Sequence, residues 1–156
     1  MDIRRADLRD LPELCTVFRD AVLTLGPQAY SRRQVTAWAE FADADNFPLF
    51  VATAATFVAE DLAGIRGFCG VEEDGHVASV YVRPDSFRRG IASRLLAHVI
   101  SYAADIGIPR LHAEASHFSR PLFHKFGFTD IRVETVKRNN VLFKRFLVER
   151  LAGSPH

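Results

Sequence analysis

Apolar residues in the first part of the chain recur every three or four positions, which is typical of amphipathic helices. The first such pattern predicts a helix from about residue 8 to 25, with Asp7 as its N-cap and Gly26-Pro27 as its end. Residues 2–5 read as a short strand before it. The chain therefore begins with a strand that leads into a helix.

A second helix is predicted to begin after Ser31, because Val35, Trp38 and Phe41 then share one face. Residues 42–54 fit neither a helical nor an alternating pattern. They carry no prediction of secondary structure.

Further along, short runs rich in β-branched and aromatic residues are bounded by turn sequences, which is typical of strands. The predicted strands are 56–60, 64–72, 76–82, 110–115, 128–137 and 141–149. Asp74-Gly75 and Asn139-Asn140 are typical hairpin turns, since these residue types tolerate positive φ. Two helices interrupt the strands: one of about 16 residues from Ile91 that ends at Gly107, and a short one at 121–126.

The predicted order is β-α-α-β-β-β-α-β-α-β-β. Only the connection from the fourth strand through the long helix to the fifth strand demands a parallel pair. We therefore expect a mixed α+β fold with a mostly antiparallel sheet of six or seven strands flanked by about four helices. Residues 1–152 are expected to form a single domain, and 153–156 a frayed tail.

Composition narrows the function classes. The 20 Lys and Arg residues nearly balance the 19 Asp and Glu residues, so the net charge of +1 gives no general attraction to nucleic acid or membranes. No apolar run is long enough to span a bilayer and the N-terminus lacks a signal peptide, so we expect a cytoplasmic protein. Cys15 and Cys69 lie in apolar surroundings, which favours buried, reduced thiols and no metal site.

The segment Ser79 to Ile100 carries the clearest chemical signal, because a strand leads through a basic, glycine-containing turn into a helix. Unpaired N–H groups in the first turn of a helix attract anions, and Gly90 lets a phosphate approach the backbone closely. Ala92 keeps nearly the same clearance, and Arg88 and Arg89 can neutralise phosphate charge. The predicted phosphate cradle is Arg88, Arg89, Gly90, Ile91, Ala92 and Ser93.

This segment resembles motif A of the GNAT N-acetyltransferase superfamily, Arg/Gln-x-x-Gly-x-Gly/Ala, with the match at Gly90-Ile91-Ala92. The stretch Leu122 to Phe128 is similar to motif B of that family, and the element order is also the family's. The tract Tyr30 to Trp38, together with FRRGIAS and EAS, resembles a bacterial subgroup, the YafP-like acetyltransferases.

The resemblance implies a splayed sheet, in which the pantetheine arm of acetyl-CoA inserts between the fourth and fifth strands. It implies that the backbone of Val80, Tyr81 and Val82 binds the pantetheine amides and the acetyl carbonyl, and that the cradle at 88–93 holds the pyrophosphate. The implied reaction is direct transfer of an acetyl group to a primary amine within a ternary complex, without a metal ion.

Three positions depart from the family pattern. Phe87 replaces the Arg/Gln of motif A, so Arg88 or Arg89 is expected to bind phosphate instead. Phe123 occupies the place of the usual tyrosine acid; it is expected to contact the cofactor, but it has no proton to donate. Ser116 occupies the place of a frequent asparagine and can still hydrogen-bond pantetheine. An alternative function, motivated by Phe87 and Phe123, is a non-catalytic acyl-CoA-binding or regulatory module.

The sequence does not single out one general base or one general acid. Candidate bases are Glu72, Glu73, His76 and Glu114. An unperturbed histidine has a pKa of about 6.5, which suits His76 for this role. Residues 72–76 are equally compatible with a solvated turn, and Glu114 with either a base, an anchor for a substrate cation, or a solvated carboxylate.

Candidate acids are Tyr30, Tyr81 and Ser116, although Tyr81 also suits a packing role. Tyr30 and Trp38 are expected on the substrate-side wall, where aromatic rings suit amines, while the spacing of Trp38 also fits core packing. The expected acceptor is a small-molecule amine or a peptide amine. Nucleic-acid binding through Arg32-Arg33 and Arg88-Arg89 is opposed by the nearly neutral net charge and by the lack of a recognised motif. The last hairpin is a candidate dimer surface.

Overall fold

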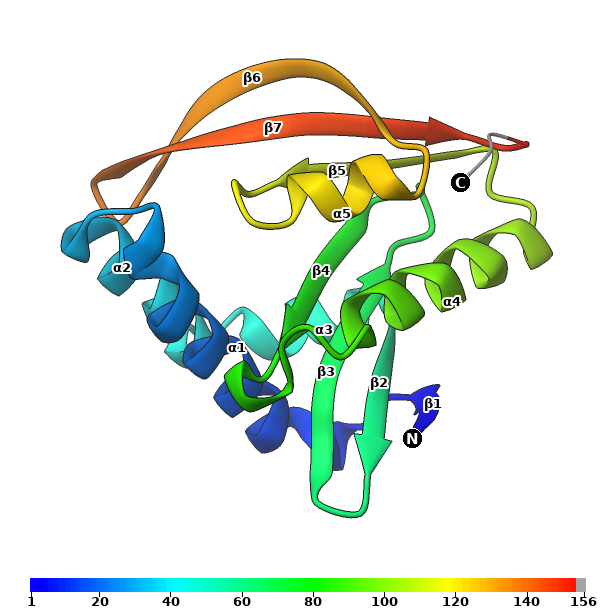
Figure 1. The fold of residues 1–156 in the computed structure, drawn as a ribbon, viewed down its shortest axis with the longest axis horizontal. Helices are drawn as coiled ribbons and strands as arrows, with labels where there is room; N and C mark the ends of the chain where they lie inside the picture. The colour runs from blue at the N-terminus through cyan, green and yellow to red at the C-terminus, as the bar shows by residue number, and fades with distance from the viewer. Residues whose placement is uncertain (154–156) are drawn as a thin grey trace.

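Two antiparallel sheets, and not one continuous sheet, form the framework of the protein (Figure 1). The computed structural model describes residues 1–153; residues 154–156, the last part of the expected frayed tail, lie outside the described residues. The first sheet has the order β1-β2-β3-β4 and the second the order β5-β7-β6. The strands are β1 (Asp2–Arg5), β2 (Ala55–Asp61), β3 (Gly64–Val71), β4 (Val77–Val82), β5 (Arg110–Ala115), β6 (Thr129–Arg138) and β7 (Val141–Leu151).

The mixed α+β class and the mostly antiparallel pairing are confirmed. The expected parallel pair is reduced to one isolated bridge, His76↔His112, because β4 and β5 diverge beyond it. Gly75 brings the sheets together at this point: it has φ +94°, and a Cβ on it would lie 1.9 Å from the carbonyl oxygen of Arg110. The His112 N–H donates a hydrogen bond to the Gly75 carbonyl across 3.0 Å. The sheets therefore meet by close backbone contact at one end and splay at the other.

Five helices flank the sheets: α1 (Leu11–Leu25), α2 (Arg32–Ala39), α3 (Phe47–Thr53), α4 (Ile91–Asp105) and α5 (Arg120–Lys125). Helix α3 lies in the segment that carried no prediction. Ser31 caps α2 as expected, in a reciprocal arrangement with Gln34. Asp7 caps a short 3₁₀ turn, Leu8–Asp10, and α1 itself begins only at Leu11, next to Pro12.

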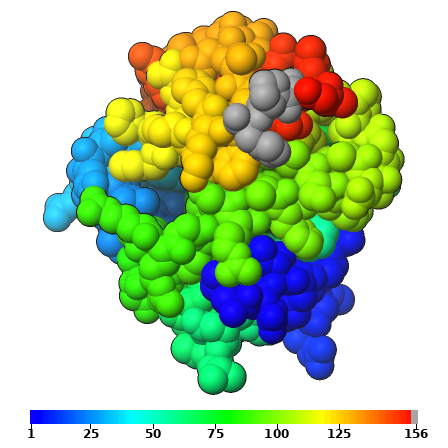
Figure 2. All heavy atoms as spheres, turned by 45° about the vertical axis from the view of Figure 1, so that its right-hand side comes forward, coloured from blue at the N-terminus to red at the C-terminus, as the bar shows by residue number. Residues whose placement is uncertain are grey.

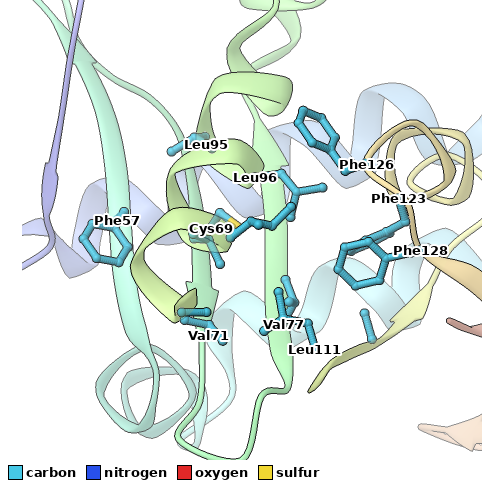
Figure 3. Close-up of a cluster of buried hydrophobic side chains, with 14 of the residues drawn as sticks. Phe57, Cys69, Val71, Val77, Leu95, Leu96, Leu111, Phe123, Phe126 and Phe128 are labelled. Carbon is cyan, nitrogen blue, oxygen red and sulfur yellow. The ribbon is translucent and has the colours of Figure 1, made fainter. Parts of the chain in front are cut away.

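Apolar side chains gather in two clusters on opposite faces of the first sheet. On one face α4 packs against β2 and β3, with Leu95, Leu96 and Cys69 fully buried (Figure 3). Phe123, from the second sheet's side, completes this cluster. On the other face α1 contributes Phe18, among other buried residues. Helix α4 packs against the first sheet and shares its buried cluster with residues of β5 and α5, so this cluster joins the two halves of the splay.

Candidate active site

Two neighbouring cavities open where the sheets diverge. The larger is about 610 Å³ and the smaller about 250 Å³. Figure 2 shows the surface hollowed between the segment that precedes α4, in green, and the α5 segment, in yellow. Both cavities are lined by Trp38, Val77, Ala78, Tyr81, Glu114 and Ser116. A ligand in one cavity would therefore meet a ligand in the other beside Tyr81, Glu114 and Ser116. We call this meeting point of the two cavities the junction.

Strand β4 and helix α5 form opposite walls of the smaller cavity. Val80 and Val82 line it from β4, and Phe123 lines it from α5. Since β4 is the edge strand of its sheet, alternate residues direct backbone N–H and C=O groups away from β3 and into the splay. The smaller cavity thus offers an unpaired strand edge with apolar walls, which suits a long ligand that carries amides.

The predicted cradle lies at the N-terminus of α4, next to this cavity. Gly90 is the N-cap of α4, with φ +76° and no side-chain cap on the helix. A Cβ on Gly90 would meet nothing within 4 Å, so the protein itself does not fill this space. Arg88 also has positive φ, +65°, and both it and Arg89 are exposed. The uncapped N–H groups and these guanidinium groups fit a phosphate group.

The other cradle residues differ in where their side chains lie. Ile91 is buried in the core, so only its backbone is available to a ligand, whereas Ala92 lines the smaller cavity. Ser93 accepts a hydrogen bond from the Nζ of Lys125 across 3.1 Å. Lys125 is a cation that the sequence pattern did not single out, because α5 brings it to α4 from a distant part of the chain. Phe87 lines the smaller cavity and packs on the core.

His76 lies between two carboxylates, where the two sheets meet and next to the junction. Its Nδ1 is 2.9 Å from Glu72 Oε1, and its Nε2 is 2.8 Å from Glu114 Oε2. These hydrogen bonds, chiefly the one to Glu114, outweigh burial and raise the pKa of His76 to about 9. The premise of an ordinary pKa for His76 was therefore wrong, because the sequence did not show that two carboxylates contact one ring.

Glu114 is the carboxylate that lines both cavities. The hydrogen bond from His76, and then the nearby charges of His76 and Arg145, lower the pKa of Glu114 despite its partial burial. Arg145 Nη1 lies 3.8 Å from Glu114 Oε1, and Arg145 also pairs with Glu134. Arg145 was missed from sequence, since the register of β5 and β6 on β7 alone brings it there. Glu114 is held ionised at the junction.

The side chain of Tyr81 faces the larger cavity's aromatic wall. Its ring packs on Phe18 with centroids 4.6 Å apart, and its hydroxyl accepts a hydrogen bond from Trp38 Nε1 across 3.4 Å. Burial raises the pKa of Tyr81 to about 12. Tyr81 therefore combines the packing role with a position at the junction, and its proton is held tightly.

Tyr30 and Trp38, which the resemblance predicts on the substrate-side wall, line the larger cavity. Their rings meet edge to face with centroids 5.6 Å apart. The Tyr30 hydroxyl accepts a hydrogen bond from the N–H of His117 across 3.1 Å and so ties this wall to the loop before α5. Trp38 also packs against the buried cluster, as its spacing predicted, and its role toward a substrate stays a prediction.

Charged residues of the last hairpin also line the larger cavity. Arg138, Lys144 and Arg145 reach it from β6 and β7, beside Glu40 and Asn139. The sequence pattern identified this segment only as a hairpin. Both turn residues, Asn139 and Asn140, adopt the positive φ expected for them.

Within the described part of the chain, 1–153, no helix is long and apolar enough to cross a bilayer. In the same residues no three His, Cys, Asp or Glu side chains are grouped so that they could hold a metal ion.

Comparison with known proteins agrees with this architecture. Residues 27–149 match the model of the acetyltransferase (GNAT) domain family. The uncharacterized N-acetyltransferase YafP of Escherichia coli (strain K12) is 29% identical over 146 residues, which cover 94% of this chain and 93% of that protein.

Two solved structures share the fold. A GCN5-related N-acetyltransferase from Rhodopseudomonas palustris has a TM-score of 0.90 at 22% identity, covering 96% of this chain and 94% of that one. The PaiA N-acetyltransferase from Thermoplasma acidophilum, solved in complex with coenzyme A, has a TM-score of 0.76 at 16% identity, covering 96% and 98%. With a splayed sheet, a cradle before α4 and a family match over most of its length, this chain belongs to the GNAT family and is an acyltransferase.

Proposed function

We propose that the protein transfers an acetyl group from acetyl-CoA to a primary amine by direct attack within a ternary complex. The observation that carries the proposal is the meeting of two cavities at Tyr81, Glu114 and Ser116. One cavity has the strand edge and cradle that suit the cofactor, and the other has the aromatic and charged walls that suit an amine. The two reactants can then be bound side by side, which removes much of the entropic cost of bringing them together.

The residues of the smaller cavity fit coenzyme A. Arg88, Arg89 and the N–H groups from Gly90 to Ser93 would hold the pyrophosphate, and the β4 backbone from Val80 to Val82 would hold the pantetheine amides. The space beside Gly90 is open, as a phosphate contact requires. The CoA complex of the Thermoplasma relative supports the same cofactor class for this fold. The cofactor supplies an activated acetyl group and a thiolate leaving group.

The ionised carboxylate of Glu114 favours a cationic acceptor. His76 contacts Glu72 and Glu114, and Arg145 lies near Glu114 and Glu134. Glu134 also pairs with Arg132. The pKa of Glu114 is lowered, so its carboxylate can pair with an ammonium group of the acceptor. Glu114 lines both cavities, so we assign to it the binding of this ammonium group and the acceptance of its proton, directly or through a water molecule.

His76 is a positioning residue in this proposal. At neutral pH it is already protonated, because its pKa is about 9, so it has no lone pair with which to act as a base. It fixes Glu114 through a hydrogen bond of 2.8 Å. Glu72 engages the other ring nitrogen, and Glu73 is exposed on the turn.

No covalent intermediate is needed. Cys69 is fully buried, and burial raises the pKa of its thiol far above the usual range. Cys15 is partly buried, and burial raises its pKa as well. Neither thiol lines the two cavities.

The test combines calorimetry with acetyl-CoA and a thiol-release assay over a panel of small-molecule amines and peptide amines. We expect saturable cofactor binding, turnover with at least one amine, and no acetylated protein by mass spectrometry when the acceptor is omitted. The double variant Cys15→Ala/Cys69→Ala is expected to keep the wild-type rate on that amine. Tight binding without turnover on any amine would favour a non-catalytic acyl-CoA-binding module, and absence of cofactor binding would refute both functions.

A further inference from the structure

Phe123 leaves the proposed reaction without a side-chain hydroxyl at the place where the family tyrosine stands. Ser119 lies four residues earlier, one helical turn back along α5, so it shares a face with Phe123. Both residues line the smaller cavity. Ser119 and Phe123 therefore border the same space.

The hydrogen bonds of Ser116 fix the direction of its own proton. Its Oγ accepts one hydrogen bond from the N–H of Phe118 across 3.2 Å and another from the N–H of Ser119 across 3.1 Å. A hydroxyl oxygen has two lone pairs, and both are used by these bonds. In its contact of 3.2 Å with Ser119 Oγ, Ser116 must therefore be the donor.

The same accounting applies to Ser119. Its Oγ accepts the N–H of Ser116 across 2.9 Å as well as the hydroxyl proton of Ser116. Both of its lone pairs are then occupied, so Ser119 can act only as a donor toward any further partner. Within residues 1–153, Ser119 Oγ donates no hydrogen bond to another group, so its proton is available to a ligand in the smaller cavity.

This chain of donors also strengthens the last hydrogen bond. Each group that donates to a hydroxyl oxygen polarises its O–H bond, so hydrogen bonds in series reinforce one another. Ser119 is last in a series that begins at the backbone N–H groups of Phe118 and Ser119. It therefore presents a polarised hydroxyl beside the junction with Ser116.

We propose that Ser119 donates a hydrogen bond to the sulfur atom of coenzyme A as it leaves, in place of the family tyrosine. The inference rests on the proposed acetyl transfer. In that reaction the amine nitrogen forms a bond to the acetyl carbon, the carbon–sulfur bond breaks, and its electron pair goes to sulfur. Ser119 stabilises this thiolate without losing its proton, since a serine hydroxyl is a much weaker acid than a thiol. The proton released by the amine passes to Glu114 and solvent, and the thiolate later takes one from solvent.

The first test measures the thiol pKa of bound coenzyme A from thiolate absorbance during a pH titration, with no acceptor present. An ordinary cysteine thiol has a pKa of about 8.5, and we expect Ser119→Ala to raise the pKa of the bound thiol by about one unit relative to wild type. Ser101→Ala, on the exposed face of α4, is the matched control and should leave that pKa unchanged.

The second test measures turnover on the amine found in the panel. We expect Ser119→Ala to lower kcat about tenfold with little change in the KM for acetyl-CoA. The variant Ser119→Ala/Phe123→Tyr returns a hydroxyl to the same cavity without remaking the contacts to Ser116. We expect it to recover most of kcat and to lower the thiol pKa again.

The outcomes separate the two proposals. If coenzyme A binds and the Ser119→Ala complex has the wild-type thiol pKa, the assignment of Ser119 is wrong whether or not an acceptor is known. If Ser119→Ala lowers kcat and Phe123→Tyr restores nothing, Ser119 supports the loop before α5 and has no role at sulfur. If coenzyme A does not bind to the wild-type protein, the proposed acetyl transfer itself fails.

Discussion

The smaller and the larger cavity are lined by different parts of the chain. One stretch of sequence, Val77 through Ala92, supplies the largest contiguous part of the smaller one and includes the backbone edge of β4. The larger one is assembled from α2, the segment around Phe50, β5 and the last hairpin, and its polar groups are side chains. Backbone recognition suits a cofactor common to a family, whereas side-chain recognition can change with the acceptor. Substitutions in one cavity should therefore affect its own ligand and leave binding of the other ligand largely unchanged.

The largest effect is expected from Gly90→Val. The branched side chain would occupy the open space of the cradle and strain a residue with φ +76°, so affinity for acetyl-CoA should fall at least about a hundredfold by calorimetry. Gly107→Val is the control, because Gly107 has φ +80° at the other end of α4 and equally open surroundings. A Gly90→Val variant with unchanged affinity would refute the cradle.

Glu114→Gln should affect the acceptor side. Loss of the negative charge at the junction should lower kcat/KM for the amine by about 30- to 100-fold, while affinity for acetyl-CoA changes less than about twofold. Glu73→Gln, an exposed carboxylate on the nearby turn, should behave as wild type in both assays. Equal losses in both ligands would mean that the two cavities are not independent.

His76→Gln should lower stability in a pH-dependent way. The pKa of His76 rises from 6.5 to about 9 on folding, so its contribution is complete below about pH 6.5 and is lost as the pH rises through about 9. At pH 7 we expect a loss of about 1–3 kcal/mol by chemical denaturation. The difference from wild type should shrink toward pH 10. The exposed His117→Gln serves as control, and a difference that does not vary with pH would exclude the ionic contribution.

Arg89→Ala should have the smallest effect. An exposed guanidinium group beside a phosphate is screened by salt, so we expect affinity for acetyl-CoA to fall about threefold to tenfold at low ionic strength and less at high ionic strength. Arg33→Ala, an exposed arginine on α2, should change neither value. A loss that is independent of salt would indicate a contact other than a charge contact.

The contrast between the cavities also explains what the sequence could predict. Every predicted helix and strand is present in the structure, because each is coded by local periodicity and by turn residues such as Asn139 and Asn140. The cradle at 88–93 was accessible for the same reason, since its strand, turn and helix are contiguous. The secondary structure and the proposed cradle are both local in sequence here.

The contacts at and around the junction could not be predicted from local sequence patterns. The pKa of His76 depends on Glu114, which lies 38 residues further along the chain, and Arg145 joins them only through strand register. Likewise, the proposed role of Ser119 as a donor depends on its hydrogen bonds to Ser116, which the spacing of residues in the sequence does not predict. Pairings across the splay depend on tertiary structure, and helix α3 shows the same limit, since it forms where the local pattern was ambiguous.

The backbone bridge between the sheets at Gly75 and His112 has a consequence for dynamics. The His112 amide bonds to the Gly75 carbonyl at the closed end of the splay, so its proton can exchange with solvent only when that end opens. Hydrogen–deuterium exchange at this one amide would therefore measure how often the sheets part. A ligand held between β4 and β5 that braces both sheets should slow the exchange. Exchange at the His112 amide would thus report whether a ligand is bound between the sheets.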